Sequence, residues 1–261
     1  MILGLIQART GSTRLPGKIF MEFSGKPDLF HVYNRAKKSK MIDKVIIATT
    51  DEKSDDKVFE YCKKENIECF RGSEDDVLDR FYQCCKQQGL SEQDIVVRIT
   101  ADCPLIDPFI IDEVIDYFRN NDFDYVSNAI EPTFPDGLDT EVFTFLALKK
   151  SWEEAKLPSE REHVTPYIRN NEPLFKIGSF KNSTDLSHYR WTLDEIEDYQ
   201  LINIIYETLY SQDDVFITKD ILLLIKNNPQ LNEINNKYAR NEGYLKSLEA
   251  DKKIESGDLN E

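Results

Sequence analysis

The chain has 261 residues, and its 33 Lys and Arg against 48 Asp and Glu give a formal charge of −15. This length can bury a substantial core, and a hydrophobic content of 40% is typical of a globular enzyme. The acidity excludes a protein whose main partner is nucleic acid, because affinity for a phosphate backbone comes from clustered Lys and Arg.

The charge is unevenly distributed along the chain. Residues 1–40 hold eight Lys and Arg against Glu22 and Asp28, so this part is basic and the remainder strongly acidic. No apolar run approaches the roughly 20 residues of a membrane span, and no basic segment precedes the apolar start, as one would in a signal peptide. The five cysteines form no CxxC pair and lie far from the three histidines, which fits a reducing compartment better than disulfides or zinc. We therefore expect a cytoplasmic protein that binds neither membrane nor nucleic acid.

Short apolar strands alternate with amphipathic helices over residues 2–128. The expected strands cover residues 2–7, 44–49, 67–70, 95–100 and 124–128. The expected helices cover residues 29–40, 58–66, 75–88 and 110–121, with Ser54 and Asp55 as candidate caps of the second. This alternation predicts the α/β class, with a Rossmann-like, mostly parallel sheet flanked by helices. Ligands bind such sheets at the carboxyl ends of the strands, where the polar loops of this chain follow.

The pattern changes at residues 129–190, which are interpreted as a small insert. Residues 134–145, FPDGLDTEVFTF, contain a Pro-Asp-Gly turn and then alternating apolar positions, which predict hairpin strands. Residues 153–171 predict helical pieces that are interrupted by Pro158 and Pro166. The elements expected next are a strand that ends at residues 191–194, a helix that starts there and a last core helix at 219–228.

The strongest local feature is the segment Gln7-Ala-Arg-Thr-Gly-Ser-Thr-Arg-Leu-Pro-Gly-Lys18, which follows the first strand. Its glycines allow close backbone approach, and Arg9, Arg14 and Lys18 can converge on one polyanion such as a triphosphate. It matches neither the GxxxxGK[ST] loop nor the dinucleotide GxGxxG pattern. A solvated loop with stray cations is the alternative, but three cations and two glycines in so short a segment favour phosphate binding.

Two aspartates are predicted at carboxyl ends of strands, on the side of the sheet that holds this loop. Asp102 follows the strand at 95–100, and Asp194 ends the strand expected near residue 191. Two carboxylates that face a triphosphate are the usual way to hold Mg²⁺. Helix N-capping is an equally good interpretation of each aspartate from spacing alone.

Several segments resemble a known enzyme family in the same order along the chain. LIQARTGSTRLPGK, ITADCPLIDP and WTLDEIEDYQLI resemble motifs of the cytidylyltransferases that activate acidic sugars, the CMP-KDO and CMP-sialate synthetases. FRGSEDDVLDRF, FPDGLDTEVF and LPSEREHVTPYIRN are similar to the SpsF-type branch of spore-coat polysaccharide synthesis. The resemblance covers about residues 1–210.

The resemblance implies a role for individual residues. The residues that it and the loop chemistry assign to nucleotide binding are Gln7, Ala8, Arg9, Gly11, Ser12, Arg14, Lys18, Arg71 and Thr100. Asp102 and Asp194 match positions that bind Mg²⁺, and Arg9, Lys18 and Asp102 are the expected catalytic residues. One departure concerns the base, because the KDO branch has a Gln that helps read cytosine where this chain has Thr100.

The implied reaction transfers CMP from CTP to an acidic sugar of the nonulosonate or KDO type, with release of pyrophosphate, for surface glycan synthesis. Candidate acceptor-binding residues are Asp136, Asp139, Glu141, Arg161 and His163. Asp136 as a turn residue and Arg161 as half of a surface ion pair are the structural alternatives. Other functions left open are a nucleotidyltransferase that forms a CDP-type product from a sugar phosphate or other phosphorylated acceptor, a glycosyltransferase, and a nucleotide-binding scaffold without catalysis.

The chain is divided into two parts on this basis. Residues 1–225 form the expected nucleotidyltransferase domain, with the insert at about residues 129–190 as a hairpin or dimerisation region. Residues 226–261 are expected to form a helical extension and a polar tail. The insert and the resemblance together predict a homodimer.

Overall fold

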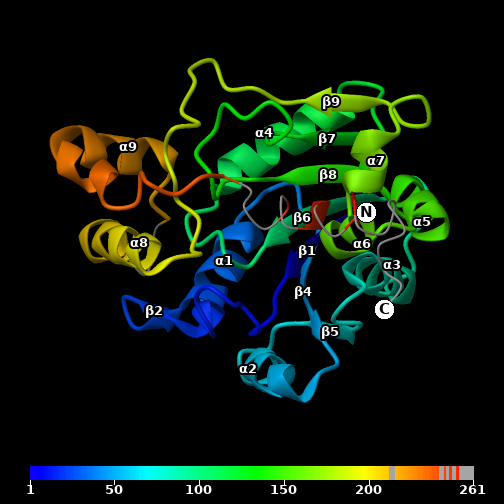
Figure 1. The fold of residues 1–261 in the computed structure, drawn as a ribbon, viewed down its shortest axis with the longest axis horizontal. Helices are drawn as coiled ribbons and strands as arrows, with labels where there is room; N and C mark the ends of the chain where they lie inside the picture. Colours follow the sequence, from blue (N-terminus) through cyan, green and yellow to red (C-terminus); the bar gives the residue numbers. More distant parts are fainter. Residues whose placement is uncertain (212–214, 241–243, 245–246, 249–250, 253–261) are drawn as a thin grey trace.

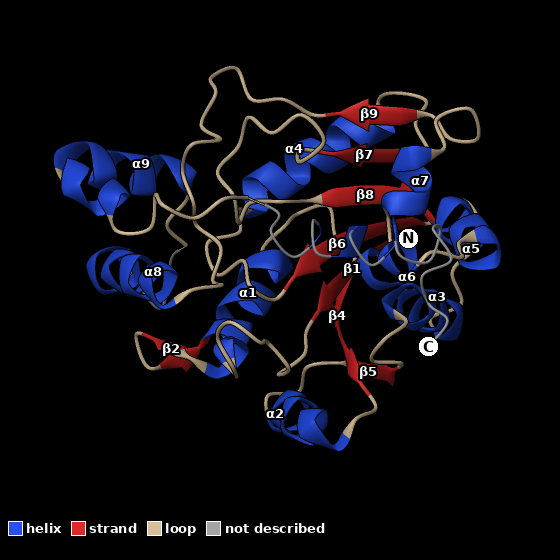
Figure 2. Cartoon of the chain, in the orientation of Figure 1, coloured by secondary structure: helices blue, strands red, loops and turns tan. Residues whose placement is uncertain are grey.

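The structure, a computed structural model, describes residues 1–211, 215–240, 244, 247–248 and 251–252. Its centre is a seven-stranded sheet with the strand order β5-β4-β1-β6-β8-β7-β9 (Figures 1 and 2). The strands are β1 (Ile2–Gln7), β4 (Lys44–Thr50), β5 (Cys69–Gly72), β6 (Ile95–Thr100), β7 (Tyr125–Ser127), β8 (Glu141–Thr144) and β9 (Ile177–Ser179). Only β8 runs antiparallel to its neighbours. The predicted Rossmann-like α/β fold is confirmed.

The inner strand β1 is buried because both of its sides and both of its faces are covered. It pairs in parallel with β4 and β6, and the register aligns Gln7 with Ala48 and with Thr100. Parallel strands covered on both faces have near-continuous apolar sequences, as ILGLIQ does. The register brings the ends of β1, β4 and β6 to one edge of the sheet, so the loops that follow them lie together.

Helices cover both faces of the sheet (Figure 2). Their bounds are α1 (Asp28–Lys37), α2 (Asp56–Lys64), α3 (Val77–Gln87), α4 (Pro108–Arg119), α5 (Phe145–Glu154), α6 (Pro158–His163), α7 (Pro166–Asn170), α8 (Ile196–Leu209) and α9 (Thr218–Asn227). One core cluster joins α1, α2, α4, α8 and α9 to one face. A second cluster joins α3, α5 and α7 to the other. Among the described residues, no helix combines the length and the apolar character needed to cross a bilayer.

Residues 129–190 contribute two strands to the central sheet. Within the segment 134–145 only β8 forms, so the prediction of hairpin strands there is wrong for residues 134–140, which are loop. The reason is a close approach: Gly137 has φ +103°, and a Cβ on it would lie 2.5 Å from the backbone carbon of Trp191. Pro158 and Pro166 begin α6 and α7, as the helical interruptions predicted.

The expected strand before Asp194 is also absent. Its place is taken by a single parallel bridge between Asp136 and Arg190, after which residues 191–194 form a loop. This loop is held by the carbonyl of Asp102 rather than by a neighbouring strand.

Outside the sheet, a hairpin of β2 (Glu22–Phe23) and β3 (Lys26–Pro27) packs against α8. The ring of Phe23 stacks on Tyr206 of that helix at a centroid distance of 5.2 Å. After α9, a short 3-10 helix, η3 (Pro229–Glu233), leads into a segment that returns towards α6 (Figure 1). The predicted polar tail lies outside the described residues from position 253 onwards, while the described part of the extension reaches the site below.

Candidate active site

The loop after β1 lines the larger of two adjoining cavities. This cavity has a volume of about 570 Å³. The residues of the predicted phosphate-binding segment that line it are Gln7, Arg9, Gly11, Ser12, Thr13, Arg14 and Lys18. Thr100, at the end of β6, lines it too, whereas Ala8 is buried in the core. The residue types that sequence reasoning assigned to a triphosphate therefore face one space.

The charge of Arg9 is only weakly neutralised by nearby carboxylates. Its guanidinium lies 3.9 Å from carboxylate oxygens of Glu74 and of Glu162, and all three side chains are well exposed. Exposed pairs of this kind contribute at most about 1 kcal/mol. The guanidinium can therefore turn to a phosphate group in the cavity at little cost.

Asp55 fixes the start of the loop. Its buried carboxylate accepts hydrogen bonds from Thr10 N (2.8 Å), Thr10 Oγ1 (2.7 Å) and Thr50 Oγ1 (2.5 Å). Asp55 precedes α2 as expected, but its side chain caps no helix backbone. Instead it connects the loop after β1 to the end of β4, a role that spacing alone did not indicate.

Lys18 lies between the two predicted metal ligands. Its Nζ donates to Asp102 Oδ2 at 2.8 Å and to Asp194 Oδ1 at 2.6 Å. Burial lowers the pKa of Lys18, but the two carboxylates outweigh burial and raise that pKa above its ordinary value. Burial likewise raises the pKa of Asp102, but the Lys18 ammonium prevails and brings it down to about 2. Lys18 and Asp102 are therefore both charged at neutral pH.

Backbone contacts bring Asp102 and Asp194 together across 92 positions of sequence. The carbonyl oxygen of Asp102 accepts from Leu193 N at 2.8 Å and from Thr192 Oγ1 at 3.2 Å. The segment that carries Asp194 is thus tied to the end of β6. The predicted juxtaposition of the two aspartates is present, although Asp194 does not end a strand.

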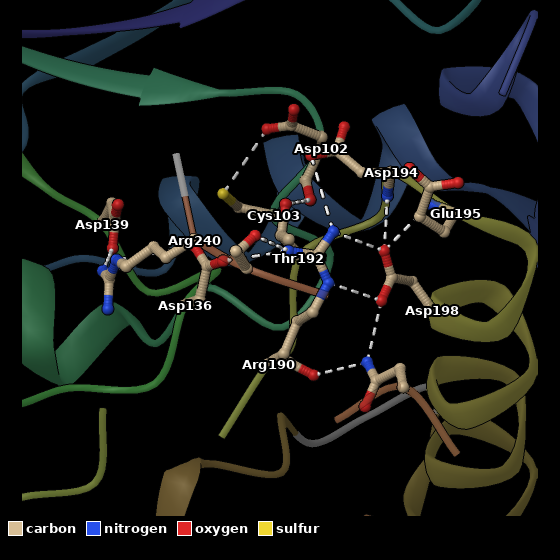
Figure 3. Close-up of polar contacts among 12 residues, drawn as sticks. Asp102, Cys103, Asp136, Asp139, Arg190, Thr192, Asp194, Glu195, Asp198 and Arg240 are labelled. Atoms are coloured by element: carbon tan, nitrogen blue, oxygen red, sulfur yellow. Dashed lines mark hydrogen bonds and ion pairs between the residues drawn. The ribbon is translucent and has the colours of Figure 1, made fainter. Parts of the chain in front are cut away.

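A buried ion pair beneath Asp194 organises this part of the site (Figure 3). The Arg190 guanidinium donates to both carboxylate oxygens of Asp198, each at 2.9 Å. Asp198 is fully buried and also accepts from the backbone N–H groups of Asp194 (3.0 Å) and Glu195 (2.9 Å). The side chain of Asn235 donates to Asp198 at 2.8 Å and to the Arg190 carbonyl at 2.9 Å. One pair therefore holds the loop that carries Asp194, the start of α8 and the C-terminal segment.

A second cavity of about 260 Å³ adjoins the first. Residues shared by the linings of both cavities are Arg14, Arg98, Thr100, Asp102, His163 and Asp194. The carboxylate pair therefore stands where the two spaces meet. The smaller cavity also contains three of the predicted acceptor residues, namely Asp136, Asp139 and Glu141.

Each of these three acids already has a partner. Arg240, from the C-terminal segment, forms ion pairs with Asp136 and Asp139. Burial and the proximity of Asp139 raise the pKa of Asp136 to about 7. Glu141 accepts hydrogen bonds from Arg98, Tyr125 and Thr165. These three contacts hold its carboxylate in the wall of the cavity.

His163 lines both cavities, as the acceptor prediction requires. Burial lowers its pKa to about 4, so the imidazole is neutral at pH 7 and acts as a hydrogen-bonding group, not as a cation. It precedes Val164, which has φ +71° and ψ −51°, and Thr165 N donates to the carbonyl of His163 at 2.8 Å. These values define the rare, strained form of the γ-turn.

Besides the buried Ala8, two predicted site residues lie apart from both linings. Arg161 donates to the Asp76 carboxylate and to the Trp152 carbonyl, so its guanidinium joins α6 to the start of α3. Arg71 donates to the carbonyls of Thr50 and Glu52 and to the Asp56 carboxylate.

Other residues at the site were not anticipated: Arg98, Arg169, Arg190, Asp198, Asn235, Arg240 and Tyr244. Arg98 offered a signal, because it is a charge inside the apolar strand IVVRIT. The others follow no local pattern and meet only in the fold.

A sheet with one antiparallel strand, a cationic loop after its first strand and two carboxylates facing that loop define a nucleotidyltransferase. The family model for cytidylyltransferases matches residues 3–252, and the chain belongs to this family. It is therefore an enzyme of the cytidylyl-transfer class.

Relatives of this chain include proteins of similar length. A cytidylyltransferase of known structure from Leptospira borgpetersenii is 39% identical with a TM-score of 0.84, over 91% of this chain and 99% of that one. The spore coat polysaccharide biosynthesis protein SpsF of Bacillus subtilis is 35% identical over 87% of this chain and 95% of SpsF. An uncharacterised protein of Methanocaldococcus jannaschii is 42% identical over 90% and 94% of the two chains. The resemblance to the SpsF-type branch is confirmed.

We predict that Asp198→Ala lowers the free energy of unfolding by about 3–5 kcal/mol, because it leaves the buried Arg190 charge without its main partner. Glu197→Ala is the matched control, since Glu197 lies next to it in α8 but pairs with the exposed Lys237. The control should lose at most about 1 kcal/mol. Urea unfolding measures both; equal losses would contradict the central role of the pair.

We predict that Asp55→Ala lowers the free energy of unfolding by about 3 kcal/mol and raises KM for the nucleotide, because three donors lose their shared acceptor. Ser54→Ala, at an exposed neighbouring position, serves as the control. Denaturant melts and steady-state kinetics test the pair. An unchanged nucleotide KM would mean that the loop keeps its shape without Asp55.

Proposed function

We propose that this enzyme transfers CMP from CTP to an acidic sugar, with release of pyrophosphate, in surface glycan synthesis. The observation that carries the proposal is the meeting of the two cavities at Asp102 and Asp194. CTP phosphates would occupy the larger cavity, against the loop after β1. The acceptor would occupy the smaller cavity, so its hydroxyl would reach the α-phosphorus at the junction.

The residues at the junction suit Mg²⁺. Mg²⁺ is usually bound through one or two carboxylates, together with substrate phosphates and water. Asp102 and Asp194 supply these carboxylates, since one oxygen of each lies within 2.8 Å of the same ammonium nitrogen. Bound there with CTP, the ion would neutralise charge on the phosphoryl oxygens and lower the pKa of the attacking hydroxyl.

The cations of the loop would act on the triphosphate. Lys18 and Arg9 would neutralise the charge that grows on the departing pyrophosphate, and Arg14 would hold the chain of phosphates. Such transfers need little covalent work from the protein, because positioning and electrostatic stabilisation carry most of the catalysis. The family resemblance of the motifs supports the same assignment of roles. A cytoplasmic homodimer completes the proposal.

The test is pyrophosphate release from CTP and Mg²⁺ with 3-deoxy-manno-octulosonate, N-acetylneuraminate or mannose 1-phosphate as the acceptor. We expect release with an acidic sugar and a loss of at least about 100-fold in kcat for Asp102→Asn and Asp194→Asn. Asp112→Asn, on α4 away from both cavities, controls for loss of an acidic residue. Pyrophosphate release with mannose 1-phosphate as the only active acceptor would contradict this function and indicate an enzyme that forms a CDP-type product.

A further prediction concerns Lys18 as a competitor of the metal. The Lys18 ammonium lies between the same carboxylates. Mn²⁺, used here as a spectroscopic probe for Mg²⁺, must therefore displace this ammonium unless a bound triphosphate draws the ammonium away. Lys18→Met should lose pyrophosphate release yet bind Mn²⁺ about 10-fold more tightly without CTP. Electron paramagnetic resonance of free Mn²⁺ measures the affinity, with the exposed Lys38→Met as control. Weaker Mn²⁺ binding by Lys18→Met would contradict a metal site at this junction.

A further inference from the structure

Arg169, on α7, differs from the other arginines that line the smaller cavity. Arg14 pairs with Asp194, Arg98 with Glu141 and Arg190 with Asp198. Among the described residues, Arg169 forms no ion pair, and its Nε is shut off from solvent without a hydrogen-bond partner. It is thus the cation of this lining that has no ion-pair partner in the described part of the chain.

The surroundings hold the Arg169 guanidinium in place but do not satisfy it. The ring of Tyr244 lies 5.2 Å from the guanidinium carbon and makes an edge contact with His163 at 5.3 Å. Glu141 is the nearby acid, and its oxygens already accept from three other groups. The aromatic ring lies over the guanidinium, and the N–H groups at the guanidinium edge are the donors that a further partner would use.

An unpaired guanidinium in a cavity wall needs a partner. Leaving a charged donor desolvated without an acceptor is unfavourable, and Arg forms its strongest contacts with planar oxyanions through two parallel hydrogen bonds. The ion pairs of the other lining arginines leave no carboxylate of the described residues paired with Arg169. We propose that Arg169 binds the carboxylate of the acceptor sugar and is the residue that selects acidic over neutral acceptors.

The charge of the lining favours a carboxylate over a phosphate. Four arginines face five carboxylates there, and His163 is neutral at pH 7. The pKa of Asp136 is raised by burial and by Asp139, which brings the lining closer to balance. Such a lining accommodates one negative charge at Arg169 but repels the second charge of a phosphate monoester. The inference rests on the proposed function and specifies which chemical group of the acceptor is recognised.

The test compares wild type, Arg169→Gln and Arg169→Lys with 3-deoxy-manno-octulosonate, N-acetylneuraminate, the carboxamide of each sugar, and mannose 1-phosphate. We expect Arg169→Gln to raise KM for the better acid roughly 10- to 100-fold and to leave KM for CTP within about two-fold. The KM of Arg169→Lys for the acidic sugar should lie between those of wild type and Arg169→Gln, because Lys keeps the positive charge but lacks the planar pair of donors of Arg. Wild type and Arg169→Gln should treat the carboxamide alike.

The exposed Arg119→Gln, at the end of α4, is the matched control and should behave as wild type. Titration calorimetry of the same sugars, without turnover, separates this inference from the proposed function. Binding of an acid that Arg169→Gln weakens, with no pyrophosphate release, would support the Arg169 site and overturn the transfer function. Turnover of an acidic sugar at a rate and KM that Arg169→Gln leaves unchanged would support the transfer function and overturn the Arg169 site. Binding of mannose 1-phosphate alone, or of none of the probes, would overturn the carboxylate assignment.

Discussion

The site depends on the buried pair of Arg190 and Asp198. Such a pair is expensive to desolvate, so it persists only where further hydrogen bonds satisfy both partners. Here the backbone before α8, Asn235 and the carbonyl of Ala239 supply them. The consequence is geometric, because Asp194 is anchored by its own backbone N–H and its side chain stays available to the cavity. The stability of the pair and the position of the Asp194 carboxylate are therefore linked.

Positively and negatively charged side chains alternate outwards from the Arg190–Asp198 pair. Asp198 neutralises Arg190, which also contacts Asp136, and Asp136 in turn contacts Arg240. At the junction of the cavities, Lys18 neutralises Asp102 and Asp194. A site built in this way is close to neutral locally although the chain carries −15. The acidity of the whole protein and the handling of an anionic substrate are thus compatible.

Much of the fold and half of the site could be predicted from the sequence because the signals are local. The apolar run of β1 and the cations of the loop after it, such as Lys18, lie within one short segment. Arg161 shows where prediction from sequence fails. No neighbouring residue indicates that its guanidinium will donate to the distant Asp76. The bend at Gly137 likewise depends on the distant backbone of Trp191. Partnerships between remote segments decide which charges remain for a ligand.

The return of the C-terminal segment to the site has a consequence for biosynthesis. More than 200 residues separate Lys18 from Asn235. A chain grows from its N-terminus, so the loop after β1 exists long before Ala239 and Tyr244 can complete the second cavity. A translation product that stops before this segment would keep the loop for a nucleotide while lacking the wall for its second substrate. Under the proposed function, premature termination would then yield a nucleotide binder without an acceptor site.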